Sequence, residues 1–473
     1  METQVHAQME STSKGRMRHL LVVAGILLAA FLVYFPELRY ALVYDDYPQL
    51  ISNPRLTMWS YVPGYFTTHL WAHSSRIAPI YYRPLFLLWF RFVYALLGPP
   101  APIWHLPSVL AHVVATACIF ALLRRLTGKF QGAALGTLLF VIHPIHAEPV
   151  AWVSSCGDLL LTIFLVLCVY FYAKRRGPIS WPAMLFALLA MFTKEIGIVA
   201  PVLLFAYDWS YSGFRRAASN APPYLLPAVL YMGFRMNALG GAVTGAHPEM
   251  SFTAMVLNWP RVLAAYARHL LWPVHVSLSY DVSGGSFLWP LMLTLAVLAG
   301  LIWLLRDNDA AIRFGVAWVA VTIAPALAIR YITWDDYVHD RYLYLPSVGL
   351  ALIAAVWLGR VRFTVPRSVA ACTLVLVLCW GTRLNLHIWQ DGVSLFTRAM
   401  ETAPRNVMVK NNLAEAYLTA KRPDQAFPLL QQLLRDNPDF DLANRNMARY
   451  YWEIGNVEEA NRYREISRQM GQR

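Results

Sequence analysis

The sequence predicts an all-α protein, a polytopic membrane bundle of about eleven helices followed by a short helical-repeat domain. Hydrophobic residues make up 58% of the 473 positions and charged residues only 14%, with a mean hydropathy of +0.42. This is too apolar for soluble domains and is typical of a polytopic membrane protein. Apolar runs close to the ~20 residues that cross a bilayer recur between short clusters of Lys and Arg. Residues 389–473 contain no such run.

The first apolar run covers residues 20–36 and follows Lys14, Arg16 and Arg18. It has no small-residue cleavage site, so we expect a retained anchor and not a signal peptide. Residues 1–18 are then a cytoplasmic N-terminal tail, because basic residues stay on the cytoplasmic side.

Further spans are expected through the membrane domain, residues 19–388. They lie near 103–124, 133–152, 158–173, 181–194, 196–210, 222–240, 288–305, 314–331, 343–359 and 368–386. Basic clusters follow every second span, which places all of them inside and the C-terminus outside. The run 181–209 is divided in two, because Lys194 and Glu195 at the bilayer centre would cost several kcal/mol.

The net charge of +13 does not indicate nucleic acid. Lys and Arg occur in short clusters between apolar runs, as topology determinants do. All five cysteines lie in or beside apolar runs without metal or disulfide spacing, so we expect small buried hydrophobes.

Two long outside loops follow from this topology, residues 37–102 and 241–287. The first carries an apolar stretch, 84–97, which we expect to lie along the membrane interface. The second contains a helical stretch, 260–271. Both would cover the same side of the bundle.

The C-terminal residues repeat with a period of 34, the tetratricopeptide period. Residues 405–438 align with 439–472 and follow a half unit, 391–404. The matched positions are Asn412-Leu413-Ala414 with Asn446-Met447-Ala448, Tyr417 with Tyr451, and Ala426 with Ala460. About two and a half repeats fall short of the ~3 needed for independent stability, so we expect the array to lean on the membrane domain.

Asp45 and Asp46 follow the first span, where the chain has just left the bilayer. An exposed carboxylate there is suited to deprotonate an acceptor hydroxyl at the lipid surface. Adjacent carboxylates repel, which raises one pKa, and the sequence leaves open which residue is the base. The alternative is an Asp-Asp loop that caps an interfacial helix.

His143, His146 and Glu148 have the spacing of a zinc site. We expect no metal, because Pro144 and Pro149 break the helix that would align these side chains and no further ligand is evident. Hydrogen bonds to a substrate are the favoured role, and an interhelical polar contact is the alternative. His105 and Asp158, at the outer ends of neighbouring spans, are weaker site candidates.

Seven signatures in order resemble the transmembrane and tetratricopeptide-repeat-containing O-mannosyltransferases and their bacterial relatives, which belong to the GT-C class of lipid-sugar-dependent glycosyltransferases. They cover nearly the whole chain, although animal members carry longer repeat arrays. The signatures are Tyr44-Asp45-Asp46, Tyr82-Arg83-Pro84-Leu85, His143-Pro144-Ile145-His146-Ala147-Glu148, Lys194-Glu195, Leu271-Trp272-Pro273-Val274-His275, Arg341-Tyr342-Leu343-Tyr344-Leu345-Pro346-Ser347 and the terminal repeats.

The resemblance implies inverting transfer of a sugar, with mannose as first candidate, from a polyprenyl-phosphate carrier to a protein or glycan hydroxyl on the outer face. It implies no nucleotide-sugar site, and we expect no cofactor beyond the lipid-linked donor. The short repeat array favours a bacterial inner membrane with the repeats in the periplasm. There the repeats would deliver an acceptor protein or dock a partner in an envelope-assembly complex.

A lipid phosphate as leaving group calls for fixed cations. Arg83 and Arg341 are the best candidates, because a guanidinium pairs with phosphate in a bidentate fork. Their alternative role is snorkelling to the headgroups. Lys194 is a third candidate that Glu195 could neutralise. Asp335, Asp336 and Asp340 are expected to include a salt-bridge partner that holds Arg341.

Two other classes of function rank below the enzyme. A transporter or flippase of lipid-linked glycans would have a midplane site and a repeated half, whereas the polar residues here gather at outer ends without internal symmetry. A non-enzymatic scaffold that works through its repeats gives no reason for polar residues on one side of the bilayer.

Overall fold

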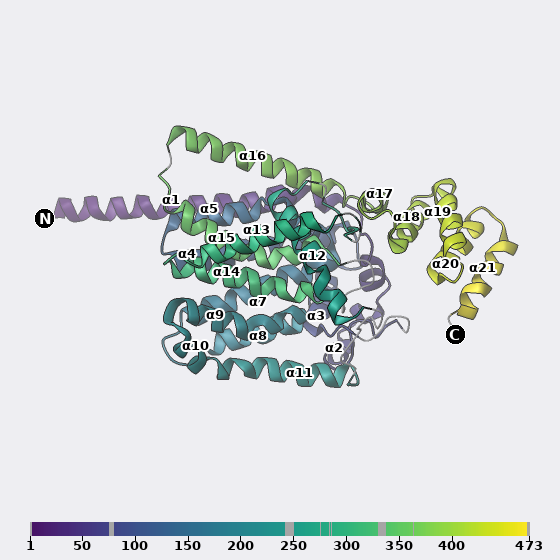
Figure 1. The fold of residues 1–473 in the computed structure, drawn as a ribbon, viewed down its shortest axis with the longest axis horizontal. Helices are drawn as coiled ribbons and strands as arrows, with labels where there is room; N and C mark the ends of the chain where they lie inside the picture. The colour runs from purple at the N-terminus through teal and green to yellow at the C-terminus, as the bar shows by residue number, and fades with distance from the viewer. Residues whose placement is uncertain are drawn as a thin grey trace.

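The computed structural model describes residues 2–74, 80–241, 250–274, 276–282, 284, 286–329, 337–362 and 364–470 (Figure 1). These residues form helices, turns and loops without a β-strand. The predicted all-α fold class is confirmed. The helices of the bundle run side by side, and the C-terminal array lies beyond the end opposite the N-terminus (Figure 1).

Each predicted span contains a helix. The bundle helices are α1 (Glu2–Tyr34), α4 (His105–Thr127), α5 (Phe130–Val141), α6 (Ala147–Ala151), α7 (Cys156–Ala173), α8 (Trp181–Thr193), α9 (Ala200–Ser212), α11 (Leu226–Ala238), α13 (Leu288–Leu304), α14 (Ala310–Ile323), α15 (Tyr344–Leu358) and α16 (Val365–His387). Within the described ranges, 6 helices are long and apolar enough to cross a membrane, or 7 if the segments 130–141 and 144–151, bent by 54°, form one span. The others are shorter than predicted: a 13-residue helix such as α8 is only about 20 Å long.

The chain turns back between α8 and α9, as predicted. Arg175, which precedes α8, donates to Asp208 near the end of α9 at 2.9 and 2.8 Å. The two helices are therefore antiparallel, and Lys194 and Glu195 lie at the turn between them. The division of residues 181–209 into two helices is confirmed.

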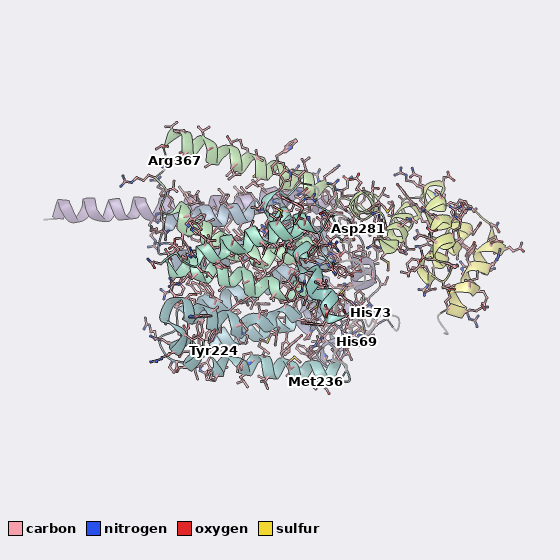
Figure 2. The ribbon with its side chains drawn as sticks, viewed as in Figure 1. His69, His73, Tyr224, Met236, Asp281 and Arg367 are labelled. Carbon is pink, nitrogen blue, oxygen red and sulfur yellow. The ribbon has the colours of Figure 1, made fainter. Side chains whose placement is uncertain are left out.

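The predicted basic clusters share one end of the bundle. Arg125 donates to the carbonyl of Ala173 at 3.0 Å, and Lys129 to that of Gly359 at 3.4 Å. Figure 2 shows Arg367 at this end and Asp281 at the opposite end, beside the array. The predicted basic clusters therefore share one end of the bundle, as the topology prediction requires.

Small residues bring the central helices close together. A Cβ on Gly132 of α5 would lie 2.1 Å from the carbonyl oxygen of Ala355 of α15, and one on Gly136 would lie 2.5 Å from that of Ala351. Close backbone approach at small residues is how helices associate in lipid, where apolar burial gives little driving force. Any larger side chain at Gly132 would push α5 and α15 apart.

The two long loops contain the expected helices. Helix α3 (Pro84–Leu97) covers the predicted apolar stretch, while α12 (Phe252–Leu271) starts earlier than predicted. The earlier start has a local cause, because the Ser251 side chain accepts from the Ala254 N–H at 3.1 Å and caps the helix. Shorter helices are α2 (Val62–Thr67), α10 (Phe214–Asn220), η1 (Phe35–Arg39), η2 (Tyr47–Ile51), η8 (Glu195–Val199) and η12 (Asp340–Leu343).

The C-terminal array comprises α17 (Gly392–Thr402), α18 (Val407–Thr419), α19 (Pro423–Asp436), α20 (Asp441–Glu453) and α21 (Val457–Met470). Helices α18 and α20 start 34 residues apart, at 407 and 441, and α19 and α21 likewise at 423 and 457. Ala414, Ala426 and Ala460 are buried where the helices pack. Helix α17 rests on the bundle, so the expected support from the membrane domain is present.

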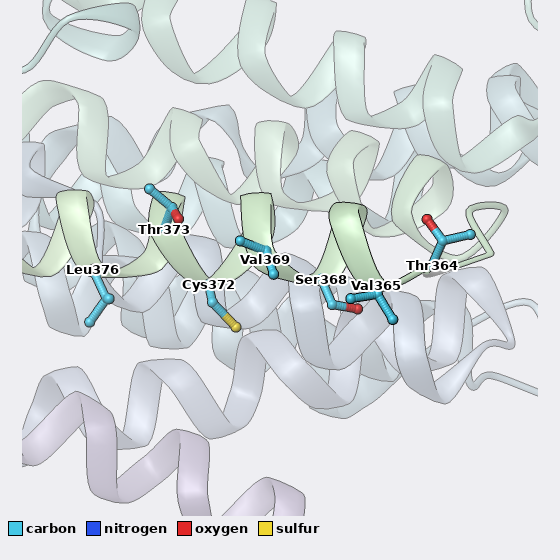
Figure 3. A pocket seen from close by; sticks show the side chains of 7 residues that line it. All are labelled: Thr364, Val365, Ser368, Val369, Cys372, Thr373 and Leu376. Atoms are coloured by element: carbon cyan, nitrogen blue, oxygen red, sulfur yellow. The ribbon is translucent and has the colours of Figure 1, made fainter.

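A shallow depression of about 460 Å³ lies along α16 (Figure 3). Its lining residues are Thr364, Val365, Ser368, Val369, Cys372, Thr373 and Leu376. Cys156 and Cys168 are buried, but Cys372 is exposed. The prediction of burial is wrong for Cys372, because it lies on a part of α16 that the bundle does not cover. No predicted site residue lines this depression.

Candidate active site

The predicted polar residues gather where the bundle meets the array, each at a helix end or on a short helical segment. Asp45 lies between η1 and η2, Arg83 is at the N-cap position of α3, and Asp158 is in the first turn of α7. Lys194 immediately precedes η8, and Arg341 belongs to η12, both of which are short 3-10 helices. Interrupted helices explain this grouping, since a side chain at a helix end can leave the apolar packing of the bundle. Glu148, in α6, joins them through Arg341.

Three ion pairs organise these residues. Lys194 Nζ lies 2.6 and 2.8 Å from the two carboxylate oxygens of Asp158. Arg83 donates from Nε to Glu195 Oε2 at 2.9 Å, with Nη2 also 2.9 Å from that oxygen. Arg341 donates from Nη1 to Glu148 Oε1 and from its backbone N–H to Oε2 at 3.0 Å.

The adjacent pair Lys194 and Glu195 does not neutralise itself. Lys194 has extended backbone angles, φ −155° and ψ 143°. Successive side chains of extended backbone point to opposite sides. Lys194 therefore reaches Asp158 while Glu195 reaches Arg83, and the alternative of mutual neutralisation is wrong.

Arg341 pairs with Glu148 and not with Asp340. Asp340 bonds instead to His269, with 2.8 Å between Oδ1 and Nδ1, and to the Tyr280 hydroxyl. Of the three aspartates expected to include a salt-bridge partner of Arg341, Asp340 is therefore not that partner. Asp335 and Asp336 lie outside the described residues.

Aromatic rings line the cations. The Arg341 guanidinium lies 5.1 Å from the Tyr342 ring centroid and 5.2 Å from that of Trp152. Lys194 Nζ lies 5.4 Å from the same Tyr342 ring, and Arg83 lies over Tyr81 at 4.6 Å. The Tyr342 ring thus contacts both Arg341 and Lys194. Tyr342 follows the predicted site residue Arg341 in sequence, but its residue type alone gave no reason to predict it as part of the site.

Asp46 is buried in the loop that follows α1. Its side chain is 0% exposed and accepts from the Ser154 N–H at 2.8 Å, the Ser154 hydroxyl at 2.6 Å and the Val43 N–H at 3.0 Å. Burial raises the pKa of Asp46 to about 7 despite these donors. The expectation that Asp46 is exposed is wrong: its carboxylate holds the loop against residue 154.

Asp45 remains the accessible carboxylate of the pair. It is half-buried and accepts one hydrogen bond, from Gln49 Nε2 at 3.3 Å. Burial raises the pKa of Asp45 to about 6, while the charges of Arg341 and Arg83 and the Gln49 bond oppose the rise. Asp45 therefore lies within the field of both arginines.

The backbone before Asp45 is strained. Tyr44 has φ 52°, in the left-handed region that bulky residues rarely adopt. Such a conformation costs about 1–3 kcal/mol and persists only where the surroundings impose it. The capping alternative finds no support, since the Asp46 side chain, at the N-cap of η2, makes no capping hydrogen bond.

Of the three predicted histidines, His105 and His146 are fully buried and His143 is half-buried. His146, 0% exposed, has Nε2 2.9 Å from the Ser347 hydroxyl, and His143 has Nε2 3.1 Å from the Leu270 carbonyl oxygen. His105 is fully buried in the first turn of α4. Interhelical contact, the alternative, describes His143 and His146 best. Among the described residues no three His, Cys, Asp or Glu side chains are grouped as a metal site requires.

Comparisons with known proteins come from three sources. The tetratricopeptide repeat family model matches residues 418–463. A protein O-mannosyl-transferase of Caenorhabditis elegans is 24% identical over 428 residues, covering 85% of this chain and 61% of that protein. Human protein O-mannosyl-transferase TMTC1 is 25% identical over 82% of this chain and 52% of its own length. Human TMTC3 is 23% identical over 94% and 54% respectively.

The chain is a homologue of these protein O-mannosyl-transferases. The resemblance found in the sequence signatures is thereby confirmed, and so is the expectation of a multi-pass integral membrane protein. The chain spans about half to three fifths of the length of these relatives. Among solved structures, ArnT from Cupriavidus metallidurans bound to undecaprenyl phosphate is similar with a TM-score of 0.41 at 17% identity, over 95% of this chain and 75% of that one.

Proposed function

We propose that this chain is a membrane glycosyltransferase that moves a sugar, mannose first, from a polyprenyl-phosphate carrier to a hydroxyl of a protein or glycan. One observation carries the proposal. Asp45 is an accessible carboxylate that lies within the electrostatic field of Arg341 and Arg83. A proton acceptor beside two fixed cations is the arrangement that hydroxyl attack with loss of a phosphate requires.

Asp45 is the proposed general base. The acceptor oxygen attacks the anomeric carbon as its proton passes to Asp45. The bond between that carbon and the phosphate oxygen breaks, and the polyprenyl phosphate leaves with the electron pair. Attack from the side opposite the phosphate inverts the configuration of the sugar.

The two arginines are proposed to bind the phosphate. Each uses part of its guanidinium on a carboxylate, Arg83 on Glu195 and Arg341 on Glu148. Within the described residues, Nη1 of Arg83 and Nη2 of Arg341 have no hydrogen-bond partner. Their side chains are 19% and 16% exposed. An anchored arginine with a free donor is positioned before the phosphate arrives and loses little freedom on binding it.

No metal or other cofactor is part of the proposal. Arg83, Arg341 and Lys194 supply positive charge where a metal ion would otherwise be needed. Lys194 donates two of its three N–H groups to Asp158, and its proposed contribution is to the electrostatic field of the site. Only the lipid-linked sugar and the acceptor then have to bind.

The proposed location is a bacterial inner membrane with the site and the repeats in the periplasm. The basic clusters and the candidate site lie at opposite ends of the bundle, and basic residues remain in the cytoplasm. The array lies beyond the end of the bundle opposite the N-terminus (Figure 1), and α17 contacts Tyr44 next to Asp45. We propose that it binds the acceptor protein, since repeat arrays offer extended concave surfaces.

The deciding experiment uses the full chain in lipid nanodiscs with a synthetic polyprenyl-phosphate-mannose donor and peptide acceptors. Native protein is expected to transfer mannose, and Asp45→Asn to bind the donor without turnover. Asp307→Asn is the matched control, because Asp307 pairs with Arg360 at the basic end. Equal turnover by native protein and Asp45→Asn would exclude Asp45 as the base. Movement of intact donor across the membrane without transfer would instead support a flippase.

A further inference from the structure

Helix α17, the half unit before the repeats, packs directly on the candidate site. The Phe396 ring lies edge-on to Tyr44, with 5.7 Å between centroids, and Trp389 stacks on Trp152 at 6.1 Å. Just before the helix, the carbonyl of Gln390 accepts from the Ala41 N–H at 2.9 Å. The strained residue that precedes Asp45 thus rests on α17.

The far end of α17 is joined to residues 276–282, which we call the bridging segment. The Thr402 hydroxyl donates to the Ser279 carbonyl oxygen at 2.7 Å and lies 2.8 Å from the Ser277 hydroxyl. The Asp281 N–H donates to the Thr402 carbonyl oxygen at 3.0 Å. Arg398 donates to the Val276 carbonyl oxygen at 3.3 Å. The last turns of α17 therefore hold the bridging segment at both of its ends.

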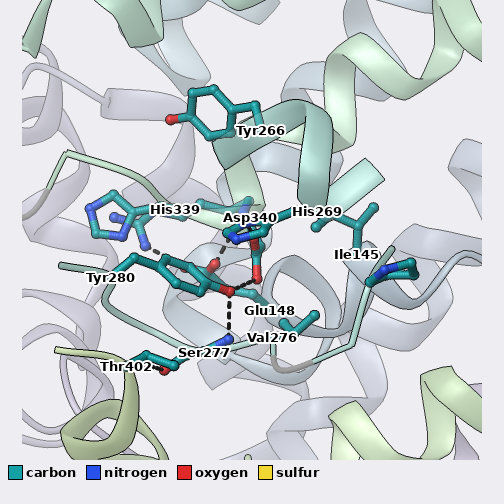
Figure 4. Close-up of polar contacts among 12 residues, drawn as sticks. Ile145, Glu148, Tyr266, His269, Val276, Ser277, Tyr280, His339, Asp340 and Thr402 are labelled. Carbon is teal, nitrogen blue, oxygen red and sulfur yellow. Dashed lines mark hydrogen bonds and ion pairs between the residues drawn. The ribbon is translucent and has the colours of Figure 1, made fainter. Parts of the chain in front are cut away.

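The bridging segment in turn holds Asp340 (Figure 4). The Ser277 N–H donates to the Tyr280 hydroxyl at 2.6 Å, and that hydroxyl donates to Asp340 Oδ2 at 2.5 Å. His269 from α12 holds the other oxygen of Asp340. Asp340 is 0% exposed, and a buried carboxylate depends strongly on each of its hydrogen bonds. Its position is thus determined by Tyr280 and His269.

Asp340 is bonded directly to Arg341 along the chain. The backbone N–H of Arg341 donates to Glu148, which also holds the guanidinium. Any displacement of Asp340 therefore displaces the first residue of the segment that presents Arg341. The Arg341 guanidinium also lies over the Trp152 ring. The same ring contacts Tyr44, with 5.4 Å between centroids, and Trp389, which lies just before α17.

We propose that α17 is a positioning element of the active site: through Phe396 it holds the Tyr44-Asp45 turn, and through Thr402, the bridging segment and Asp340 it holds Arg341. This inference rests on the proposed function. It links the repeats to the reacting groups, so that the array sets the geometry of catalysis besides binding an acceptor. Thr402 and Tyr280 are positioning residues, since neither touches the proposed substrates.

The test compares three variants of the full chain in nanodiscs. Thr402→Val removes the hydroxyl at nearly constant volume, Thr402→Ser retains it, and Tyr280→Phe breaks the next link while leaving the ring. Thr419→Val is the matched control, because Thr419 is exposed in the array and its hydroxyl bonds only to Arg449. Turnover per folded molecule, the KM for the donor and the pH profile are measured for each, with the thermal midpoint as the check on folding.

Thr402→Val and Tyr280→Phe are each expected to lower kcat/KM for the donor about tenfold, as small misplacements of catalytic groups do. In both variants the pH below which kcat/KM falls should be higher than in the native chain, because a displaced Arg341 stabilises the Asp45 carboxylate less. Thr402→Ser and Thr419→Val should behave as the native chain. A purely structural defect would lower the active fraction equally at every pH.

Native profiles for Thr402→Val and Tyr280→Phe, with Asp45→Asn inactive, would overturn the positioning role and leave the proposed function intact. A uniform loss of activity that follows the folded fraction would also overturn it. Native turnover in Asp45→Asn would overturn the proposed function itself, so the two failures are distinct.

Discussion

The two ends of the bundle use the same pair of residue types in different ways. At the basic end, Asp208 accepts from Arg175, from the Tyr172 hydroxyl at 2.7 Å and from Asn220 at 2.6 Å. At the opposite end, among the residues that the structure describes, the Asp45 carboxylate accepts only from Gln49. A carboxylate whose lone pairs are all occupied joins helices together, whereas one with unused lone pairs can take a proton.

The arginines at the two ends of the bundle also differ in how many of their Nη nitrogens are bonded. Arg175 donates to both oxygens of Asp208 and to the Tyr172 carbonyl, and its guanidinium stacks on the Tyr172 ring at 3.5 Å. Arg341 uses Nη1 and its backbone N–H on Glu148 and, among described residues, leaves Nη2 without a partner. Burial and pairing alone therefore do not distinguish a structural ion pair from a binding site. What distinguishes them is an Nη nitrogen or a carboxylate oxygen without a hydrogen-bond partner among the described residues.

The sharpest contrast is between two aspartate substitutions. Asp45→Asn should lower kcat at least about 100-fold, the usual contribution of a general base, with little change in stability. Asp208→Asn should instead lower the free energy of unfolding by about 3 kcal/mol, because it leaves Arg175 buried without its charge partner. Sugar transfer and denaturant unfolding measure the two effects. Loss of turnover in folded Asp208→Asn would break the comparison.

Lysine substitutions test the arginines next. Arg341→Lys should lower kcat/KM for the donor about 100-fold, since an ammonium cannot serve Glu148 and a phosphate in one planar fork. Arg175→Lys should retain native turnover per folded molecule and lose stability. Donor titrations with each variant decide this, and equal donor affinity in native protein and Arg341→Lys would place the phosphate elsewhere.

The pH profile provides a smaller but specific effect. A base must be ionised, so with the pKa of Asp45 raised to about 6, kcat/KM should fall about tenfold per unit below pH ~6. Arg341 opposes that rise in pKa, so Arg341→Gln should move the acid limb to higher pH. If kcat/KM instead fell only near the ordinary pKa of an aspartate, Asp45 would not be the titrating base.

Chelation should have the smallest effect. Because the proposed site relies on arginine and lysine for positive charge, EDTA dialysis should leave transfer rates unchanged. Recovery of activity only after a divalent cation is added back would contradict this, and would require ligands outside the described residues.

The sequence predicted the helices and the gathering of polar residues at one end of the bundle more successfully than it predicted how those residues pair. Apolar runs, basic clusters and a 34-residue period depend on local composition and spacing, which tertiary contacts do not change. Partners do depend on tertiary contacts: Glu195 meets Arg83, 112 positions away, and Glu148 meets Arg341, 193 positions away. Such long-range pairs produce no recognisable spacing of residues along the chain.

By itself the sequence determined that this protein is a helical membrane bundle with a repeat array, and that Asp45, Arg83, Lys194 and Arg341 lie at one end of it. Only the tertiary structure distinguished the half-buried Asp45 from the buried Asp46, because residue 154 reaches one carboxylate and not the other. It alone showed that His146 is buried and that α17 packs against the candidate site. Hydrophobic periodicity determines which end of a helix a residue occupies, but burial and hydrogen bonding from distant segments determine what that residue can do.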